Sequence, residues 1–555
     1  MNTERCINKK LKIVFIQLSS PNHYGLWNAL SVESLAGDLS GVFRNKVNIK
    51  VERIFTSDGI ASLIKKINLN IDIFAISVEL GSLPLAKQLI KSIKMKYSQA
   101  TRHTPQFVFG NTIPTYMPEL FLQLEPKAIV VRGEAEESMR GIVRNMINGT
   151  SLENIPSIVY QINGHMKETE WISPSMSSLI YPPSTHTLDR TLTHDGNAII
   201  ESSRGCPWSQ CSYCSILSGR NGRKWEAFPF KRVTANIERL VEKGINELEF
   251  VDADFLGGRK PENIERLYQI SSAINSINQS YNIYLSFRIF LTPHILYRKN
   301  EKHINRDIYN AIAHLKKVGL SKVYLGIESG CNSQLKRYRK GNDKDVVFHV
   351  LKMFRDDLNI PIDLGFLLFD PDLSIDELVE STKFYKRENL INSNQWPFRA
   401  VRVTPSTSLF EKLKKEGRLG HFDPNLLCYS YRFKDIRVQK IFDIIDKLSS
   451  ETRDIFYALK SISKLKFNKS KYHIEAQRAY QLVVDNANIY IELLDFLGNI
   501  YQGIEIDERE IVSRANIKIN KLIMEVSEEV ESGIFTKHKS YLEPKIREYC
   551  SHSII

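Results

Sequence analysis

Three closely spaced cysteines carry the most specific chemistry in this sequence: Cys206, Cys211 and Cys214 in the segment RGCPWSQCSYC. They follow the apolar run NAIIESS, so we expect them in one loop at the carboxyl end of a strand. Three thiolates in such a loop can bind three irons of a four-iron, four-sulfur cluster and leave the fourth iron open. Zinc is the alternative, but zinc takes four ligands, and only His186 and His194 lie nearby in the sequence. The spacing therefore predicts an iron–sulfur cluster.

Charged and polar residues follow further predicted strands. FVDADFLGG contains Asp252 and Asp254, YLSFRIF contains Arg288, and YLGIESG contains Glu328 and Ser329. A carboxylate accepts hydrogen bonds from an ammonium group, and a guanidinium binds a carboxylate through two parallel bonds. The alternatives are that the aspartates cap helices and that Arg288 forms a buried ion pair with Asp252 or Asp254. We expect these side chains at the rim of one ligand site.

The elements that must position these residues alternate strand and helix patterns. Six apolar runs, from NAIIESS to FRAVRVT, are each followed by a helical segment, which predicts an α/β fold with a central partial (β/α)6 barrel over residues 186–420. Residues 421–555 have mostly helical apolar spacing and are expected to form a mostly helical C-terminal domain.

A second alternation occupies the first 150 residues, with the runs KIVFIQL, VNIKVERIF, IDIFAISV, QFVFG and AIVVRGE. It predicts a doubly wound (Rossmann-like) domain. The irregular stretch of residues 155–193 is interpreted as a linker, and the boundary between the first domain with its linker and the barrel is placed after residue 185, so that this domain covers residues 1–185. Ligands of such sheets bind beyond the carboxyl ends of the strands. The small residues there suit a threaded nucleotide tail: Ser77, Gly81, Ser82, Gly110 and Thr112.

The barrel segment resembles the radical S-adenosylmethionine (SAM) superfamily, whose usual signature is C-x3-C-x2-C. Here the first spacer has four residues, and RGCPW together with Tyr213 resembles the cobalamin-binding branch. The resemblance implies that the open iron binds SAM and that Tyr213 lies near its adenine. It also implies that Asp252 and Asp254 hold the amino group, Arg288 the methionine carboxylate and Glu328 the ribose.

The first domain resembles the cobalamin-binding module of the same branch in IDIFAISVELGS, FGNTIPTYMPE and VVRGEAEES. Many cobalamin proteins place a histidine of D-x-H-x-x-G below the cobalt, but this sequence has SSPNHYG, in which the aspartate is missing and the glycine stands one residue closer. We interpret His23 as an ordinary loop histidine. A cobalt without a protein histidine on its lower face is therefore expected.

The resemblance implies an enzyme that uses a 4Fe-4S cluster, SAM and cobalamin to methylate an unactivated carbon of a small-molecule or peptide substrate. An electron donor such as flavodoxin or ferredoxin would be its partner. The alternatives are a cyclase or rearrangement enzyme with the same cofactors, an RNA methylthiotransferase, and a non-catalytic cobalamin or redox sensor. The methylthiotransferase would bring further cluster cysteines in its first domain, where only Cys6 stands.

Composition narrows the class of protein. The net charge of +13 is spread along all 555 residues, so no nucleic-acid footprint is expected. Seven cysteines without a regular framework indicate a reducing, cytoplasmic setting. No uninterrupted apolar stretch reaches about 18 residues, so no membrane span is expected.

Overall fold

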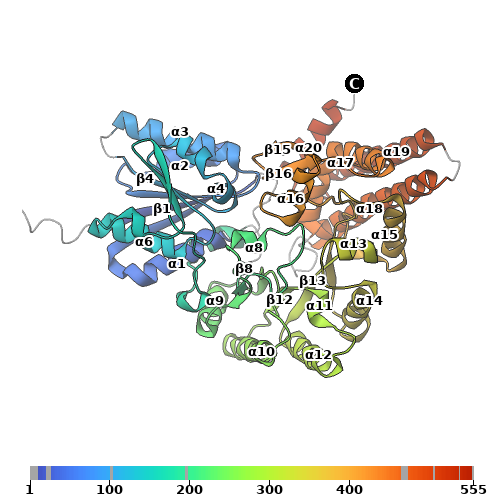
Figure 1. Ribbon diagram of the computed structural model, residues 1–555, viewed down its shortest axis with the longest axis horizontal. Coiled ribbons are helices and arrows are strands. Elements are labelled where there is room, and N and C mark those ends of the chain that lie inside the picture. Colours follow the sequence, from blue (N-terminus) through green and yellow to red (C-terminus); the bar gives the residue numbers. More distant parts are fainter. Residues whose placement is uncertain are drawn as a thin grey trace, which may run out of the picture.

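The computed structural model describes residues 10–20, 27–100, 104–193, 198–463, 473–503, 507–536 and 538–552. Its first domain is built on a parallel sheet with the strand order β2-β1-β3-β4-β5 (Figure 1). The strands are β1 (Leu11–Leu18), β2 (Val47–Ile54), β3 (Ile73–Val78), β4 (Gln106–Gly110) and β5 (Ile129–Val131), which confirms all five predicted runs. The order in which the chain adds strands reverses between β1 and β3, and the carboxyl ends of these two strands therefore open a crevice for a ligand.

Helices cover both faces of this sheet and separate two apolar cores. The helices α1 (Leu30–Phe43) and α6 (Glu136–Asn148) bury one face. The other face is covered by α2 (Ser57–Lys66), α3 (Leu83–Ala100), α4 (Thr112–Tyr116) and α5 (Pro118–Leu124). The doubly wound prediction is thereby confirmed.

The segment interpreted as a linker contains further structure. Its strands β6 (Ile158–Ile162) and β7 (His165–Glu168) pair antiparallel and continue the sheet beyond β5. The helix α7 (Leu188–Thr193) then leads into the second domain.

The second domain contains a five-stranded parallel sheet in the order β14-β13-β12-β11-β8. Its strands are β8 (Ala198–Ile200), β11 (Glu247–Phe250), β12 (Ser286–Leu291), β13 (Leu320–Glu328) and β14 (Ile362–Phe366). The main covering helices are α9 (Phe230–Glu242), α10 (Pro261–Tyr281), α12 (Lys302–Lys317), α14 (Lys344–Lys352) and α15 (Ile375–Arg387). The sixth predicted run forms no strand of this sheet and takes part only in two isolated bridges, a parallel one between Phe369 and Ala400 and an antiparallel one between Val403 and Tyr429.

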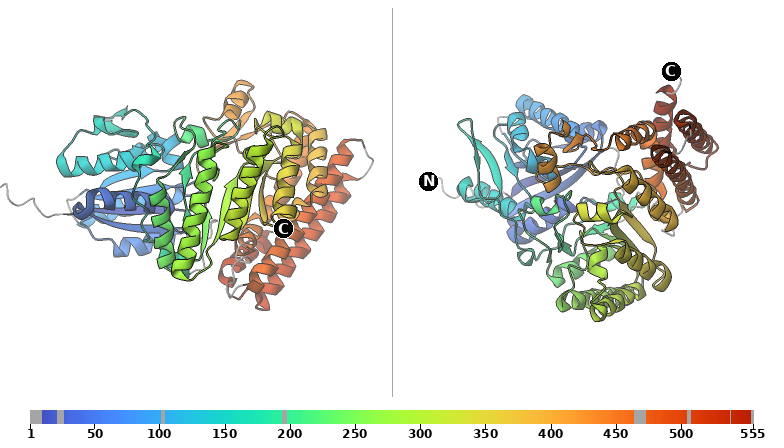
Figure 2. Two further views of the ribbon diagram at one scale, coloured as in Figure 1. Left: turned by 90° about the horizontal axis from the view of Figure 1, so that it is seen from below. Right: turned by 45° about the vertical axis from the view of Figure 1, so that its right-hand side comes forward.

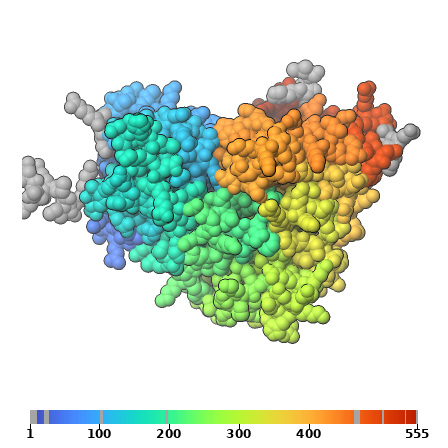
Figure 3. Space-filling model, viewed as in Figure 1, coloured from blue at the N-terminus to red at the C-terminus, as the bar shows by residue number. Residues whose placement is uncertain are grey.

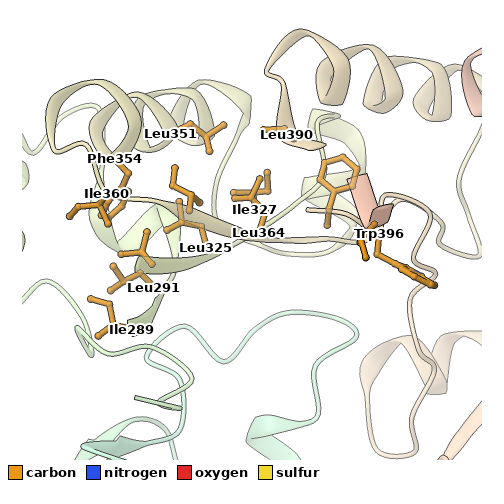
Figure 4. Close-up of a cluster of buried hydrophobic side chains, with 14 of the residues drawn as sticks. Ile289, Leu291, Leu325, Ile327, Leu351, Phe354, Ile360, Leu364, Leu390 and Trp396 are labelled. Carbon is orange, nitrogen blue, oxygen red and sulfur yellow. The ribbon is translucent and has the colours of Figure 1, made fainter. Parts of the chain in front are cut away.

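Strand alternation separates two faces of the barrel sheet. Ile289, Leu291, Leu325 and Ile327 point into the apolar layer between sheet and helices (Figure 4). The residues between them point to the opposite face, which is the barrel lumen. Smaller elements lie around the carboxyl ends of the strands: β9 (Ser203–Arg204), β10 (Glu226–Ala227), α8 (Ile216–Gly219), α11 (Pro293–Leu296) and α13 (Asn332–Arg337).

The C-terminal region packs as a helical bundle beside the barrel (Figure 2). Its helices are α17 (Ile436–Ser463), α18 (His473–Tyr501), α19 (Glu508–Glu531) and α20 (Lys539–His552). The rings of Trp396 and Tyr457 stack with centroids 4.9 Å apart, and those of Phe398 and Tyr490 lie 4.3 Å apart. The bundle and the barrel therefore share one apolar core.

A hairpin that the sequence pattern did not predict links this region to the first domain. It follows α16 (Ser408–Lys415) and consists of β15 (Leu419–Asp423) and β16 (Cys428–Tyr431). The backbone N–H of Gly81 donates to the carbonyl of Asn425 over 2.8 Å, and the two parts adjoin on the molecular surface (Figure 3). None of the helices in the described ranges is long and apolar enough to cross a membrane.

Candidate active site between the first domain and the barrel

The cysteine loop runs between β9 and α8, and all three of its thiols are partly buried and free of disulfides. Gly205 begins it with a φ of +87°, and a Cβ there would collide with the guanidinium of Arg220 and with a backbone carbonyl. Only glycine fits this close approach. The loop thus places Cys206, Cys211 and Cys214 beyond the carboxyl ends of the barrel strands, as predicted.

The three thiols lie near one another, since, in addition to burial, the charges of Cys206 and Cys214 both raise the pKa of Cys211. Among the described residues, no group of three or more His, Cys, Asp or Glu side chains is arranged to hold a single metal ion. Burial raises the pKa of each thiol, that of Cys211 to about 12, so iron is needed to stabilise the thiolates.

A buried lysine that the sequence analysis missed faces the cysteine loop. The charge of Lys340 opposes the effect of burial on the pKa of all three thiols. Its ammonium lies 3.0 Å from a carboxylate oxygen of Glu328. Burial lowers the pKa of Lys340, but Glu328 and the nearby thiols raise it above its ordinary value. No local motif distinguishes this lysine from the many others in the sequence.

Glu328, predicted at the barrel mouth, has an unusual backbone. Its φ is +67°, and the register between β13 and β14 shifts at this residue. Two glycines leave room for its carboxylate: a Cβ on Gly326 would lie 2.8 Å from it, and one on Gly365 3.2 Å. A left-handed glutamate held against such strain indicates a functional position.

His294 is a second residue that the sequence analysis missed. It is 2% exposed, and neither ring nitrogen has a hydrogen-bond partner in the described structure. Its ring lies 4.6 Å from that of Trp208, in the spacer between the first two cysteines. Burial and then the charges of Lys340, Arg298 and Arg259 lower the pKa of His294 to about 3, so the imidazole is neutral.

Asp252 lies directly beneath the cysteine loop. Its carboxylate accepts hydrogen bonds from the backbone of Ser202 and from the hydroxyls of Ser202 and Ser203, four residues or fewer before Cys206. Burial raises its pKa to about 6, against the nearby charge of Arg266. These contacts fix the start of the loop.

Asp254 is likewise occupied within the chain. One oxygen accepts from the backbone of Gly257 over 2.8 Å, and the other accepts from the backbone and hydroxyl of Thr292. Burial raises its pKa to about 6. Both aspartates thus have internal partners, and their contacts with a ligand remain predictions.

Of the other predicted rim residues, Tyr213 lies in the site, whereas Ser329 and Arg288 do not. The Tyr213 ring lies 5.2 Å from that of Tyr338 and is close enough to Glu328 to sense its charge. Ser329 instead points away from the lumen, where its hydroxyl bonds Gln334 in α13. Arg288 is the third residue of β12 and lies toward the amino end of that strand. Its side chain faces the lumen, but well below the rim.

The partners of Arg288 also differ from the expected alternative. The guanidinium lies 3.2 Å from Glu247 and 3.8 Å from Glu249 on the neighbouring strand, rather than beside Asp252 or Asp254. The parallel register pairs Glu249 directly with Arg288, which places them at the same level of the barrel.

A cavity of about 220 Å³, which we call the first-domain cavity, opens at the carboxyl ends of β1, β3, β4 and β5. Of the predicted residues, Ser77 and Gly110 line it; Gly81, Ser82 and Thr112 do not. Its apolar walls and the glycine fit a nucleotide tail of the kind that cobalamin carries. Further lining residues that the sequence analysis did not single out are Asn111, Gly133 and Glu134. His23 lies outside the described residues.

Ion pairs join the first-domain cavity to the cysteine loop. Arg204, which also lines the cavity, pairs with Glu136 over 2.8 Å, and Arg220 pairs with Glu134 over the same distance. The hydroxyls of Tyr116 and Ser218 lie 3.1 Å apart, so α8 packs against the first domain (Figure 1). Buried charges of this kind are lost only at a high free-energy cost, which holds the two parts together.

Comparison with known proteins places this site in context. Residues 200–385 match the radical SAM superfamily. A relative from Priestia megaterium, 4′-phospho-dehydrooxetanocin synthase, is 24% identical over 367 residues, which are 64% of this chain and 48% of that protein. The chain thus spans about half the length of this curated relative.

Two solved structures share the arrangement of domains. That of the cobalamin-dependent S-adenosylmethionine radical enzyme OxsB with aqua-cobalamin bound has a TM-score of 0.80 at 19% identity and covers 98% of this chain and 84% of that chain. That of the radical S-adenosylmethionine methyltransferase TsrM from Kitasatospora setae, with cobalamin and a 4Fe-4S cluster bound, has a TM-score of 0.57 at 14% identity and covers 74% and 75%. These likenesses establish the fold.

Proposed function

We propose that this protein methylates an unactivated carbon of a small-molecule or peptide substrate. The premise is that residues 200–385 form a radical SAM domain in a chain with the fold of cobalamin-dependent radical SAM enzymes. One observation carries this assignment. The first-domain cavity is lined by strand ends of the first domain and also by Arg204, two residues before Cys206. A cofactor in that cavity adjoins the cysteine loop.

The chain's own residues would divide the binding of the cofactors. Cys206, Cys211 and Cys214 hold three irons, while Tyr213 lies against the adenine of SAM. Glu328 accepts from the ribose, because its carboxylate is held at the barrel mouth by Gly326 and Gly365. Ser77 and Gly110 line the site of the cobalamin tail.

We assign the binding of the methionine carboxylate of SAM to Lys340 instead of Arg288. Its ammonium is buried beside the cysteines, whereas Arg288 pairs with glutamates at the amino end of its strand. Asp252 and Asp254 would act by holding the loop and the segment after β11, with the amino group of SAM as a further partner. When bound, the three cofactors together supply a substrate radical and a methyl group for it.

A flavodoxin or ferredoxin is the electron donor that this chemistry needs, and a reducing cytoplasm is the setting we propose, since the six cysteines of the described residues are all free. A rearrangement or cyclisation is the second candidate reaction, because the relative from Priestia megaterium is named a synthase.

Product analysis separates the two reactions. With the true substrate, a methyltransferase that also generates a radical should form S-adenosylhomocysteine and 5′-deoxyadenosine in about equal amounts, and deuterium from the target carbon should appear in 5′-deoxyadenosine. An unactivated carbon has no lone pair to attack a methylsulfonium, so both products are required. Formation of 5′-deoxyadenosine from SAM with consumption of the substrate, but without S-adenosylhomocysteine or an added methyl group, would refute the methyltransferase and support the second candidate.

A further inference from the structure

A second cavity, of about 530 Å³, lies toward the amino ends of the barrel strands and reaches α17 and α18. We call it the amino-end cavity. Lumen-facing residues of three strands line it, namely Glu249, Arg288, Lys322 and Tyr324, and Tyr480 of α18 borders it. Because their neighbours on the strands fill the apolar layer seen in Figure 4, these side chains point to the lumen.

The lining of the amino-end cavity carries an excess of positive charge. Five cationic side chains border it, against the two carboxylates of Glu249 and Asp363. Asp363 is already 2.7 Å from the ammonium of Lys322, and Glu249 is 3.8 Å from the guanidinium of Arg288. Glu247 and Glu388, which do not line the cavity, pair with Arg288 over 3.2 Å and with Arg355 over 3.3 Å, so the cation that a ligand can engage without competing with a protein carboxylate is Arg399.

Two arginines retain donors for a ligand. Arg288 is only 9% exposed, and its Nε is buried without a hydrogen-bond partner in the described structure. The side chain of Arg399, on the segment beside β14, forms no hydrogen bond or ion pair with the residues that the structure describes. The buried Nε of Arg288 without an acceptor is costly, and the exposed guanidinium of Arg399 is free to form charge-assisted hydrogen bonds, so an oxyanion that reaches both would be bound favourably.

We propose that the amino-end cavity binds the oxyanion end, phosphate or carboxylate, of the enzyme's small-molecule substrate. Arg399 is its main ligand and Arg288 the second, since a guanidinium forms paired hydrogen bonds with either group. This assignment rests on the proposed function, because it assumes that the reacting carbon lies near Glu328 and the cysteine loop.

Tyr324, which lines the amino-end cavity, also approaches the barrel mouth. Arg399 lies near Tyr324, whose pKa senses its charge. A Cβ on Gly365 would lie 2.6 Å from the Tyr324 hydroxyl and 3.2 Å from a carboxylate oxygen of Glu328, so these two side chains end close to each other. A small anionic substrate can therefore reach from Arg399 past Tyr324 to Glu328, with its charge at the end remote from the carbon that reacts.

Calorimetric titration of the full-length protein with pyrophosphate, and separately with citrate, tests the site. Arg399→Ala should weaken the binding of the preferred anion by at least about tenfold, because charge-assisted hydrogen bonds are lost. Arg402→Ala is the matched control, since Arg402 is exposed on the same segment, as Arg399 is, but does not line the cavity. Removal of Arg399 leaves no protein carboxylate without its partner, so folding should be retained, and a circular dichroism spectrum verifies it.

Each outcome decides the question. Preferential binding of pyrophosphate supports a phosphorylated substrate, preferential binding of citrate supports a polycarboxylate, and both support the oxyanion site. Absence of binding by either anion, or equal affinities of Arg399→Ala and Arg402→Ala, overturns it. Cobalamin and cluster content of the wild-type protein are measured in parallel: their absence would refute the proposed function without affecting the anion titration, so the two failures are distinguishable.

Discussion

Gly110 offers a sharp test of the first-domain cavity, because it is the last residue of β4 and lines the cavity without any side chain of its own. A Cβ at this position would meet nothing closer than the carbonyl oxygen of Val131 at 4.0 Å. Its backbone is not among the glycines with positive φ, so any residue can adopt it. Gly110→Ala should therefore fold normally and bind cobalamin nearly as well as the wild-type protein.

Gly110→Leu extends the same perturbation into the space of the ligand. It places three further carbons in a cavity of about 220 Å³ whose walls include Val108 and Met139. The free protein should tolerate them, but a ligand that fills the cavity must move aside. Overpacking of this kind costs about 1–3 kcal/mol, and the upper value corresponds to an affinity loss of about a hundredfold.

Equilibrium titration of aqua-cobalamin, followed by its visible absorbance, measures this loss, and thermal unfolding of the ligand-free variants shows that they are folded. The expected order of affinity is wild type, then Ala, then Leu. If Gly110→Leu is folded and binds cobalamin with wild-type affinity, the cofactor tail does not enter the first-domain cavity, and our assignment of that cavity is refuted.

Three further predictions concern the cofactors. Replacement of Cys206, Cys211 and Cys214 together by Ala should abolish the cluster absorbance of anaerobically reconstituted protein, because these thiolates are its ligands; a retained cluster spectrum would show that the irons are held elsewhere. The electron paramagnetic resonance spectrum of the cobalt(II) form should lack nitrogen splitting and stay unchanged in His23→Ala, whereas splitting that this substitution removes would identify His23 as the axial ligand. Lys340→Met should leave cluster content intact but weaken SAM binding about tenfold or more in calorimetry, since a charge-assisted hydrogen bond is lost; unchanged affinity would exclude Lys340 from the SAM site.

Several parts of the site could be predicted because their information is local. The three cysteines stand within nine residues, so a single loop must present them together wherever the strand before them ends. The five runs of the first domain and the barrel strands have the apolar patterns of buried strands, and their order follows from the chain. Glu328 and Tyr213 were predicted in the site because each adjoins such a motif.

Tertiary structure alone decided which distant side chains share the site. Lys340 reaches the cysteine loop from beyond α13, and Arg220 pairs with Glu134 across 86 residues of sequence. No local pattern marks these residues among 76 lysines and arginines. Their partners are chosen by how the domains dock, which depends on contacts along the whole interface.

The sequence also did not determine how deep in the barrel each side chain lies. Alternation determines which face of a strand a residue occupies, but the level at which it lies depends on the register between strands and on where each strand ends. Arg288 was therefore expected at the rim and lies instead beside Glu249 near the amino end, while Ser329, just past the strand end, turns toward α13. Sequence by itself determined the fold class and the cysteine loop, because both follow from local periodicity and spacing; the tertiary structure decided which charges surround the cofactors and where an anion can bind, because those depend on packing between segments far apart in the chain.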